Sequence, residues 1–286
     1  MSNNKLIIGT AQFIKKYGIF RKNRKQFNNF LELFKNKNIT FDTSPTYSSV
    51  EKFIGRNFKN KKISSKLPSL QNIPSKKIEE KINFFINQTL KDTQCKKIDY
   101  YLVHDENDLI KKDAKKIFYI LEKFKKKKII NKIGVSIYDF RKLERIINRF
   151  KLDVVQVPFN IIDRRLIKFY KKNKKKLKNI KIHIRSVFLQ GLLLADYNLA
   201  TRKIKNKQSL NVLFEYFNWC DKSKLKKIQI CLNFLNSNRF FNNLVVGFDN
   251  VSQYKDFSNY YKNSIKIYPK KIFTDNNKLV NPNYWI

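Results

Sequence analysis

The sequence has few residues that break, bridge or bend a backbone. Its 286 residues include six glycines, six prolines, three cysteines and two histidines. Cys95, Cys220 and Cys231 form no C-x-x-C pair and have no nearby histidine partner, so we expect no structural metal centre. An odd number of scattered cysteines is typical of a reducing compartment.

Long apolar runs are also missing. No stretch approaches the ~20 apolar residues that a membrane span requires. The opening five residues lead into a short strand-like segment, not into the apolar core of a secretory signal. Apolar residues still make up 42% of the chain, which is enough to form a core. We therefore expect a cytoplasmic globular protein with no membrane partner, and the sequence does not indicate an oligomeric state.

Acidic residues are scarce, with 22 against 62 basic ones and a formal net charge of +40. Clustered lysine and arginine can bind nucleic acid, because they release counterions from phosphates. Lysine, asparagine, isoleucine and phenylalanine are all frequent together here, which is typical of an AT-rich genome, and lysines fall on nearly every expected helix. We interpret the charge as a solvated basic surface with no specific nucleic-acid partner. It should still speed the approach of anionic ligands at low salt.

Short apolar runs alternate with amphipathic helical patterns along the chain. The predicted strands are residues 6–9, 39–42, 62–65, 98–103, 132–136, 154–158, 180–186 and 244–247. The helical patterns between them include residues 24–37, 75–93, 113–128, 138–150 and 161–176. The connection over residues 192–242 is longer than the others, and we expect an extra helix or a covering loop there.

Eight strands separated by helices predict parallel pairing, and eight is the number at which such a sheet closes into a filled barrel. A doubly wound open sheet is the alternative. It normally carries a G-x-G-x-x-G turn after its first strand, and the sequence has none. Because no proline- or serine-rich linker divides the chain, we predict an α/β fold with a single (β/α)8 TIM barrel domain over residues 1–286.

Polar side chains follow three successive predicted strands. Asp42 ends one strand and Tyr47 comes five residues later, while Lys66 and His104 follow the next two. Each alone could be a helix cap, a packed ring, a surface lysine or a core histidine. Together they favour a site, because the carboxyl ends of barrel strands are where such folds place their chemistry.

These four residue types suit the protonation of a carbonyl oxygen while another group supplies a hydride to carbon. An ammonium group beside a phenol favours the phenolate form. A carboxylate paired with that ammonium fixes its position and keeps it charged despite burial. A neutral imidazole can orient a substrate oxygen by a hydrogen bond.

Segments along nearly the whole chain resemble the aldo-keto reductase family. They are residues 6–13 (LIIGTAQF) with 17–19 (YGI), 41–47 with Glu51 and 54–55, 65–66, 102–104, 133–136 (IGVS), 155–160 (VQVPFN), 185–192 (RSVFLQGL), 245–247 (VVG) and 279–285 (LVNPNYW). The resemblance implies a barrel that binds NADP(H), with NAD(H) as the alternative, and reduces a small-molecule carbonyl such as an aldehyde, a ketone or a sugar.

The resemblance also implies roles for individual residues. It implies Tyr47 as the general acid, Lys66 and Asp42 as the pair that tunes it, and His104 as the group that orients the carbonyl. The implied cofactor-binding residues are Ser136, Gln156, Asn160, Arg185, Ser186, Leu189, Gly191, Gly247 and Gln253. No metal takes part.

Some positions depart from the family pattern. Ile137 stands where many members have asparagine, and Arg185 stands where an aromatic ring often stacks on the nicotinamide. Phe248 and Gln253 occupy the region where members that prefer NADP often offer lysine or arginine, which weakens the expectation of NADP over NAD. Ile14 and Ser48 replace common glycines in the first two loops.

Three functions remain in competition. The first is an NAD(P)H-dependent reductase without a metal. The second is a catalytically idle barrel that senses cofactor or regulates a partner, and the intact set of four polar residues speaks against it. The third is a polyanion-binding protein, which only the net charge favours.

Overall fold

A closed barrel of eight parallel strands forms the centre of the protein. The computed structural model describes residues 5–13, 28–29, 31–35 and 37–285. The strands are β1 (Lys5–Gly9), β2 (Thr40–Asp42), β3 (Lys62–Leu67), β4 (Tyr100–Val103), β5 (Ile133–Ser136), β6 (Val154–Pro158), β7 (Lys181–Arg185) and β8 (Asn243–Val246). They follow one another around the ring in chain order, and β8 pairs with β1 to close it. The predicted (β/α)8 barrel is confirmed.

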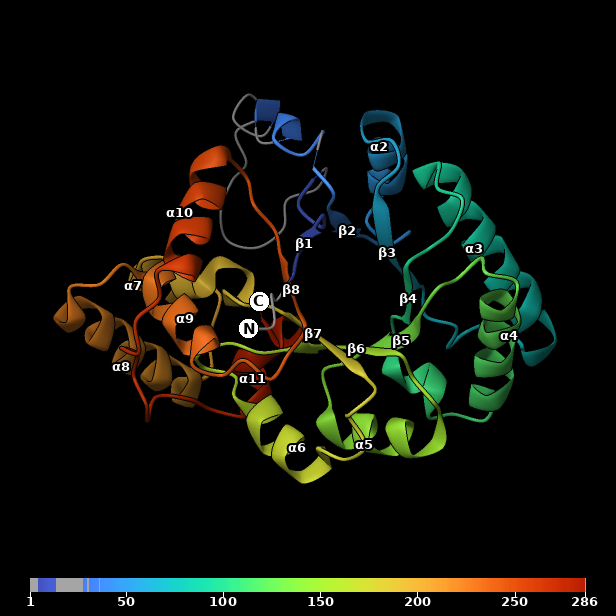
Figure 1. The fold of residues 1–286 in the computed structure, drawn as a ribbon. Helices are drawn as coiled ribbons and strands as arrows, with labels where there is room; N and C mark the ends of the chain where they lie inside the picture. The colour runs from blue at the N-terminus through green and yellow to red at the C-terminus, as the bar shows by residue number, and fades with distance from the viewer. Residues whose placement is uncertain (1–4, 14–27, 30, 36, 286) are drawn as a thin grey trace.

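Helices surround the ring of strands (Figure 1). They are α2 (Val50–Asn57), α3 (Ile78–Thr93), α4 (Ala114–Lys126), α5 (Phe140–Arg149), α6 (Arg165–Asn173), α7 (Tyr197–Thr201), α8 (Lys207–Ser223), α9 (Lys227–Asn236), α10 (Val251–Lys262) and α11 (Asn277–Val280). Short 3-10 helices are η1 (Ser75–Lys77), η2 (Glu106–Leu109), η3 (Leu189–Leu194) and η4 (Pro282–Tyr284). The long connection before β8 carries α7, α8 and α9, as expected of an extra helical insertion.

Some predictions fall on parts of the chain that the structure does not describe. Residues 17–19, which carry part of the family resemblance, and Ile14 lie outside the described residues. So do residues 24–27, 30 and 36 of the helix predicted over residues 24–37; of its described residues, 28–29 and 31–32 are helical and 33–35 form a turn. The predicted strands are all present, but β3 extends two residues further, to Leu67. The expectation that Lys66 follows the end of this strand is therefore wrong. A barrel interior accepts polar side chains, so a lysine need not end a strand there.

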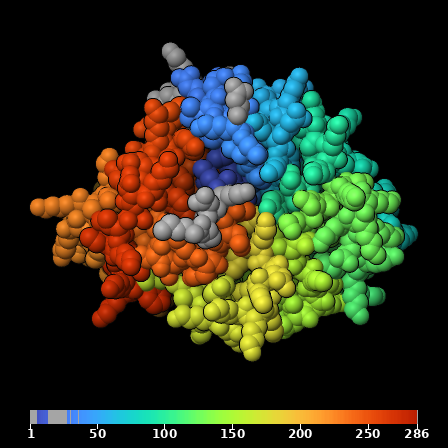
Figure 2. Space-filling model, in the orientation of Figure 1, coloured from blue at the N-terminus to red at the C-terminus, as the bar shows by residue number. Residues whose placement is uncertain are grey.

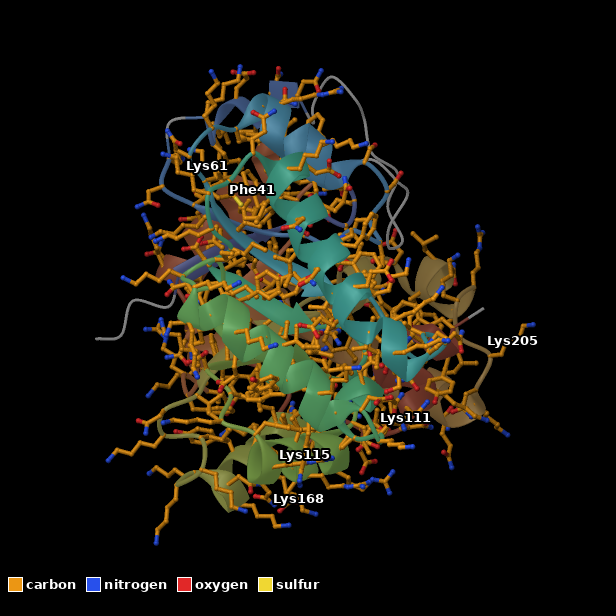
Figure 3. The ribbon with its side chains drawn as sticks, turned by 90° about the vertical axis from the view of Figure 1, so that its right-hand side faces the viewer. Phe41, Lys61, Lys111, Lys115, Lys168 and Lys205 are labelled. Atoms are coloured by element: carbon orange, nitrogen blue, oxygen red, sulfur yellow. The ribbon has the colours of Figure 1, made fainter. Side chains whose placement is uncertain are left out.

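The alternation of side chains along each strand separates two environments. In β3, Ser64 and Lys66 point into the barrel, where they contact Asp42. On the other side of β2, Phe41 is fully buried, and its ring centroid lies 4.8 Å from that of Phe58 just after α2; Figure 3 shows Phe41 inside the molecule. The apolar core thus fills the space between strands and helices, while the barrel interior can hold polar groups.

Two searches of the described residues gave negative results. No helix among them is both long enough and apolar enough to cross a membrane. No group of three or more histidine, cysteine, aspartate or glutamate side chains in this part of the chain could hold a metal ion.

Candidate active site

A cavity of about 1640 Å³ opens at the carboxyl ends of the strands. Figure 2 shows the opposite face of the molecule, at the amino ends of the strands, so the cavity is out of view there. Most of the residues singled out in the sequence line it: Asp42, Tyr47, Lys66, His104, Ser136, Gln156, Arg185, Ser186, Gly191, Gly247 and Gln253. Asn160 and Leu189 are fully buried behind this lining.

Lys66 and Asp42 form a buried ion pair. The Lys66 Nζ lies 2.6 Å from Asp42 Oδ2 and donates a second hydrogen bond, of 2.9 Å, to the carbonyl oxygen of Thr43. The two residues are 1% and 4% exposed, so water screens their attraction little. Burial alone would lower the pKa of Lys66, but the Asp42 carboxylate and the Tyr47 phenol outweigh it and raise that pKa. Lys66 is therefore charged at neutral pH.

Tyr47 and His104 lie next to this pair, although each comes from a different loop. Tyr47 follows β2, and its ring centroid is 5.2 Å from the Lys66 Nζ. His104 follows β4, and its ring meets that of Tyr47 edge-on, with centroids 6.3 Å apart. The barrel thus brings together the four side chains that the sequence places at three successive strands.

His104 carries no charge at neutral pH. Burial lowers its pKa to about 4, and the positive charges of Lys66 and Arg185 act in the same direction. A neutral imidazole has one N–H donor and one acceptor nitrogen. It can therefore donate a hydrogen bond to a carbonyl oxygen without adding a second cation beside Lys66.

A chain of hydrogen bonds extends from the ion pair toward β5 and β6. Asp42 Oδ1 accepts hydrogen bonds from Ser64 Oγ at 3.0 Å and from Gln156 Nε2 at 2.8 Å. Gln156 Oε1 in turn accepts a long bond from Ser136 Oγ at 3.5 Å. Asp42 is thus held by three donors, and Gln156 and Ser136, two of the expected cofactor-binding residues, are linked to it.

The loop after β7 has several residues in the left-handed backbone region. Ser186, Leu189, Gln190 and Gly191 all have positive φ angles, between 48° and 90°. A left-handed residue next to a right-handed one, as at Phe188 and Leu189, turns backbone N–H groups toward a common concavity, which suits phosphate. Gly191 adopts its φ of 90° without strain, whereas the other three carry a side chain in a region that such residues rarely occupy.

Arg185 stacks on Tyr138 at the edge of the cavity. Its guanidinium carbon lies 4.0 Å from the centroid of the tyrosine ring. The guanidinium also donates to the Ile137 carbonyl oxygen at 3.0 Å and to Ser186 Oγ at 3.2 Å. Arg185 is therefore held flat against the wall beside the site expected for the nicotinamide.

Three other predicted cofactor residues have side-chain contacts within the protein. Asn160 donates to the Ser186 carbonyl oxygen at 3.0 Å, and its own side-chain oxygen accepts from two backbone N–H groups of the next loop. Gln253 Oε1 accepts from the Asp249 N–H at 2.8 Å. Gly247 lies against the side chain of Gln12. The predicted cofactor roles of these residues stay predictions, and Asn160 lies where it can shape the Ser186 loop.

Sequence reasoning missed two side chains that hold predicted site residues in place. Ser64 supports Asp42, and Tyr138 supports Arg185. Ser64 could have been found, because it stands two residues before Lys66 on the same strand and must face the same side. The bond from Gln156 to Asp42 joins residues 114 positions apart and follows only from closure of the barrel.

Comparison with known proteins gives the same fold. The aldo-keto reductase AKR11C1 of Bacillus halodurans in its holo form is 15% identical, with 93% of this chain and 94% of that chain covered and a TM-score of 0.62. The thermostable aldo-keto reductase Tm1743, in complex with the inhibitor epalrestat, is 20% identical, with 92% and 90% covered and a TM-score of 0.61. At these identities the likeness concerns the fold. No curated protein sequence matches the chain.

A barrel of this topology with polar groups at its carboxyl face defines the class of the protein as a (β/α)8 barrel of enzyme type. The model of the aldo/keto reductase family matches residues 5–273, which is most of the sequence. The chain belongs to the aldo/keto reductase family. Membership supports, in general terms, oxidoreductase chemistry on carbonyl compounds.

Proposed function

We propose that this protein reduces the carbonyl group of a small-molecule aldehyde, ketone or sugar, with NADP(H) as the hydride donor and NAD(H) as the alternative. The observation that carries the proposal is the buried Lys66–Asp42 pair beside Tyr47 and His104 in one cavity. Such an arrangement has little structural purpose, because a buried ion pair seldom stabilises a fold more than apolar packing would.

The residues of the cavity fit a nicotinamide dinucleotide. Ser136 and Gln156 offer a hydroxyl and an amide that could hold a carboxamide. Ser186 and the left-handed backbone up to Gly191 suit a pyrophosphate. The cavity is larger than the upper end, about 1,000 Å³, of ordinary ligand sites, so it leaves room for a second molecule.

In this proposal the bound nicotinamide supplies the hydride that reaches the substrate carbon. Tyr47 donates the proton to the carbonyl oxygen, because the Lys66 ammonium nearby stabilises the phenolate that remains. Asp42 keeps that ammonium charged and in place. His104 orients the carbonyl by a hydrogen bond from its neutral ring.

The direct test replaces Tyr47 with phenylalanine. We expect Tyr47→Phe to lose about 10²- to 10⁴-fold in kcat, the usual contribution of a general acid. Its Kd for NADPH, measured by the change in nicotinamide fluorescence, should stay within about twofold, because the phenol is not needed to bind cofactor. Tyr119→Phe on α4 is the matched control, since that ring is 62% exposed and remote from the cavity. If Tyr47→Phe keeps the turnover of the wild-type protein, Tyr47 is not the general acid.

Assays of turnover, cofactor binding and RNA retention decide between the rival functions. Tight cofactor binding without turnover on a panel of carbonyls would indicate a regulatory barrel. Strong, salt-dependent retention of RNA would indicate a polyanion-binding protein. The ratio of Kd values for NADPH and NADH decides which dinucleotide the site prefers.

A further inference from the structure

Glu51 is a buried carboxylate that the proposed chemistry does not use. It lies in the first turn of α2 and is 2% exposed, and it is not among the described residues that line the cavity. We propose that Glu51 is a positioning residue, which holds Tyr47 at its place beside Lys66 without touching substrate or cofactor. The inference rests on the proposed function, in which Tyr47 and Lys66 act together.

The Glu51 carboxylate joins three elements. Its Oε1 accepts a hydrogen bond from Ser65 Oγ on β3 at 2.6 Å. Its Oε2 accepts one from Thr89 Oγ1 on α3 at 3.1 Å. All three residues are buried, so these bonds do not compete with water. The carboxylate therefore fixes the start of α2 against both the barrel and the neighbouring helix. We call the two hydrogen bonds of Glu51, to Ser65 and to Thr89, the clamp.

Both ends of the proposed acid–ammonium pair are close to this clamp along the chain. Ser65 immediately precedes Lys66 in β3, and the two side chains point to opposite faces of the strand. Tyr47 precedes Glu51 by four residues. The Phe53 N–H bonds to the Ser49 carbonyl oxygen at 2.9 Å, so the first turn of α2 begins only two residues after Tyr47. A shift of this turn would move Tyr47 relative to Lys66.

Apart from the bonds of Glu51, the backbone of α2 approaches α3 closely at Gly55. A Cβ added at Gly55 would clash with the Asp92 carbonyl oxygen of α3. The backbones of the two helices therefore lie close together at this point; Figure 1 shows α3 beside α2. Because Gly55 lies one turn beyond Glu51, the helix can still pivot about this contact. The hydrogen bonds of Glu51 oppose that rotation.

The clamp is costly to the fold. Burial raises the pKa of Glu51 to about 7, although the hydroxyls of Ser65 and Thr89 act in the opposite direction. An apolar side chain would fill the same space without this cost. Unlike an apolar side chain, the carboxylate makes directional hydrogen bonds, and a residue that positions its neighbours needs such bonds.

The experiment compares four variants with the wild-type chain. Glu51→Leu removes both hydrogen bonds and keeps the side-chain volume. Glu51→Gln keeps a planar group that can bond to both hydroxyls. Thr89→Val removes one bond. Thr93→Val is the matched control, because it deletes a buried hydroxyl of the same helix that bonds to the Thr89 carbonyl oxygen and to Cys95.

We expect Glu51→Leu to lose about 10- to 100-fold in kcat, the effect of a small misplacement of a catalytic group, with the Kd for NADPH within about twofold of wild type. Glu51→Gln should restore most of this loss, Thr89→Val should fall between the two, and Thr93→Val should match wild type. Equal kcat in Glu51→Leu and wild type overturns the proposal. So does a loss that the Gln variant fails to restore, or one that appears equally in the Kd.

Amide hydrogen exchange separates this inference from the proposed function. In Glu51→Leu, the segment from Thr43 to Val50 should exchange faster, whereas β6 and β7 should be unchanged. This readout needs no turnover. If the wild-type chain reduces no carbonyl, the proposed function fails, and exchange alone decides whether Glu51 positions Tyr47. Unchanged exchange, or faster exchange throughout the barrel, overturns the positioning role.

Discussion

Burial decides the charge of single polar residues in this barrel, and the two histidines show this. The sequence has two histidines, and both are held neutral by burial, which lowers the pKa of His104 to about 4 and that of His183 to about 3. His183 lies inside the barrel, where its Nε2 is 2.9 Å from the Asn243 amide. Neither ring is therefore a proton carrier in the range where histidine usually titrates.

This prediction is testable by NMR of labelled imidazole nitrogens. We expect neither ring to titrate between about pH 8 and about pH 5.5, although a free histidine has a pKa of about 6.5. The unfolded chain binds these protons first, so the contribution of the two histidines to stability should fall as the pH drops below about 6.5. Glu51, whose pKa burial raises to about 7, contributes in the opposite direction over the same range. An added histidine at an exposed site, Lys115→His on α4, supplies a control signal that should titrate normally. A midpoint near 6.5 for either native ring would contradict the structure.

At the same scale, the sequence predicted which residues form the candidate site better than it predicted the contacts that those residues make. Asp42, Tyr47, Lys66 and His104 could be predicted as a group because each stands at or just past the carboxyl end of a recognisable strand. The donors that hold Asp42 could not, because Gln156 reaches it across the barrel and no local pattern encodes that approach. Glu51 was visible only as part of a family motif, since its burial depends on Thr89 of a later helix.

Among the elements, one side chain makes several bonds to the segment between α10 and α11. Arg164 donates to the carbonyl oxygens of Pro269, Lys270 and Ile272, at 2.5 to 3.3 Å, and to that of Ile161. Its guanidinium carbon also lies 4.9 Å from the centroid of Phe273. Asn277 and Asn281, which follow this segment, line the cavity. Arg164 thus connects the start of α6 with the chain that borders the site.

Replacing Arg164 with lysine keeps the charge but not the fork of donors. We expect Arg164→Lys to lower the free energy of unfolding by about 2 to 4 kcal/mol, because carbonyl oxygens lose their donors. Limited proteolysis should cut faster after Lys270 and Lys271. Arg145→Lys on α5 is the control, since that side chain is exposed. Equal cleavage rates in the two variants would show that the anchor is unimportant.

The elements themselves were the most predictable part of the structure. All eight strands were expected, because short β-branched runs between amphipathic helices have a strong period signal. Their ends were less certain. The polar stretch of β3 conceals the end of that strand, because its side chains enter a barrel that accepts Lys66. The insertion that carries α7, α8 and α9 was expected as an extra helix or a covering loop, and the number of its helices was not.

The whole molecule has far more positive than negative charge. The formal net charge is +40, and lysines from separate parts of the chain, such as Lys111, Lys168 and Lys205, reach the periphery (Figure 3). Like charges at this density repel one another and oppose the compact state. The same field attracts anionic ligands, which under the proposed function include the dinucleotide.

Salt should therefore have two opposite effects. Between about 0.01 M and about 0.15 M salt, the screening length falls from about 30 Å to about 8 Å. We expect the midpoint of thermal unfolding to rise over this interval, while the association rate of NADPH falls at least about tenfold. Stopped-flow fluorescence and calorimetry measure the two quantities. A midpoint that falls with potassium chloride would mean that attractive pairs dominate the surface.

Closure of the sheet has a further effect on a chain so rich in asparagine, isoleucine and phenylalanine. Segments of that composition readily add to an open strand margin and grow into fibrils. Because β8 returns to β1, the barrel itself presents no such margin. Aggregation should therefore require that the barrel first opens by unfolding, and its rate should follow the rate of unfolding.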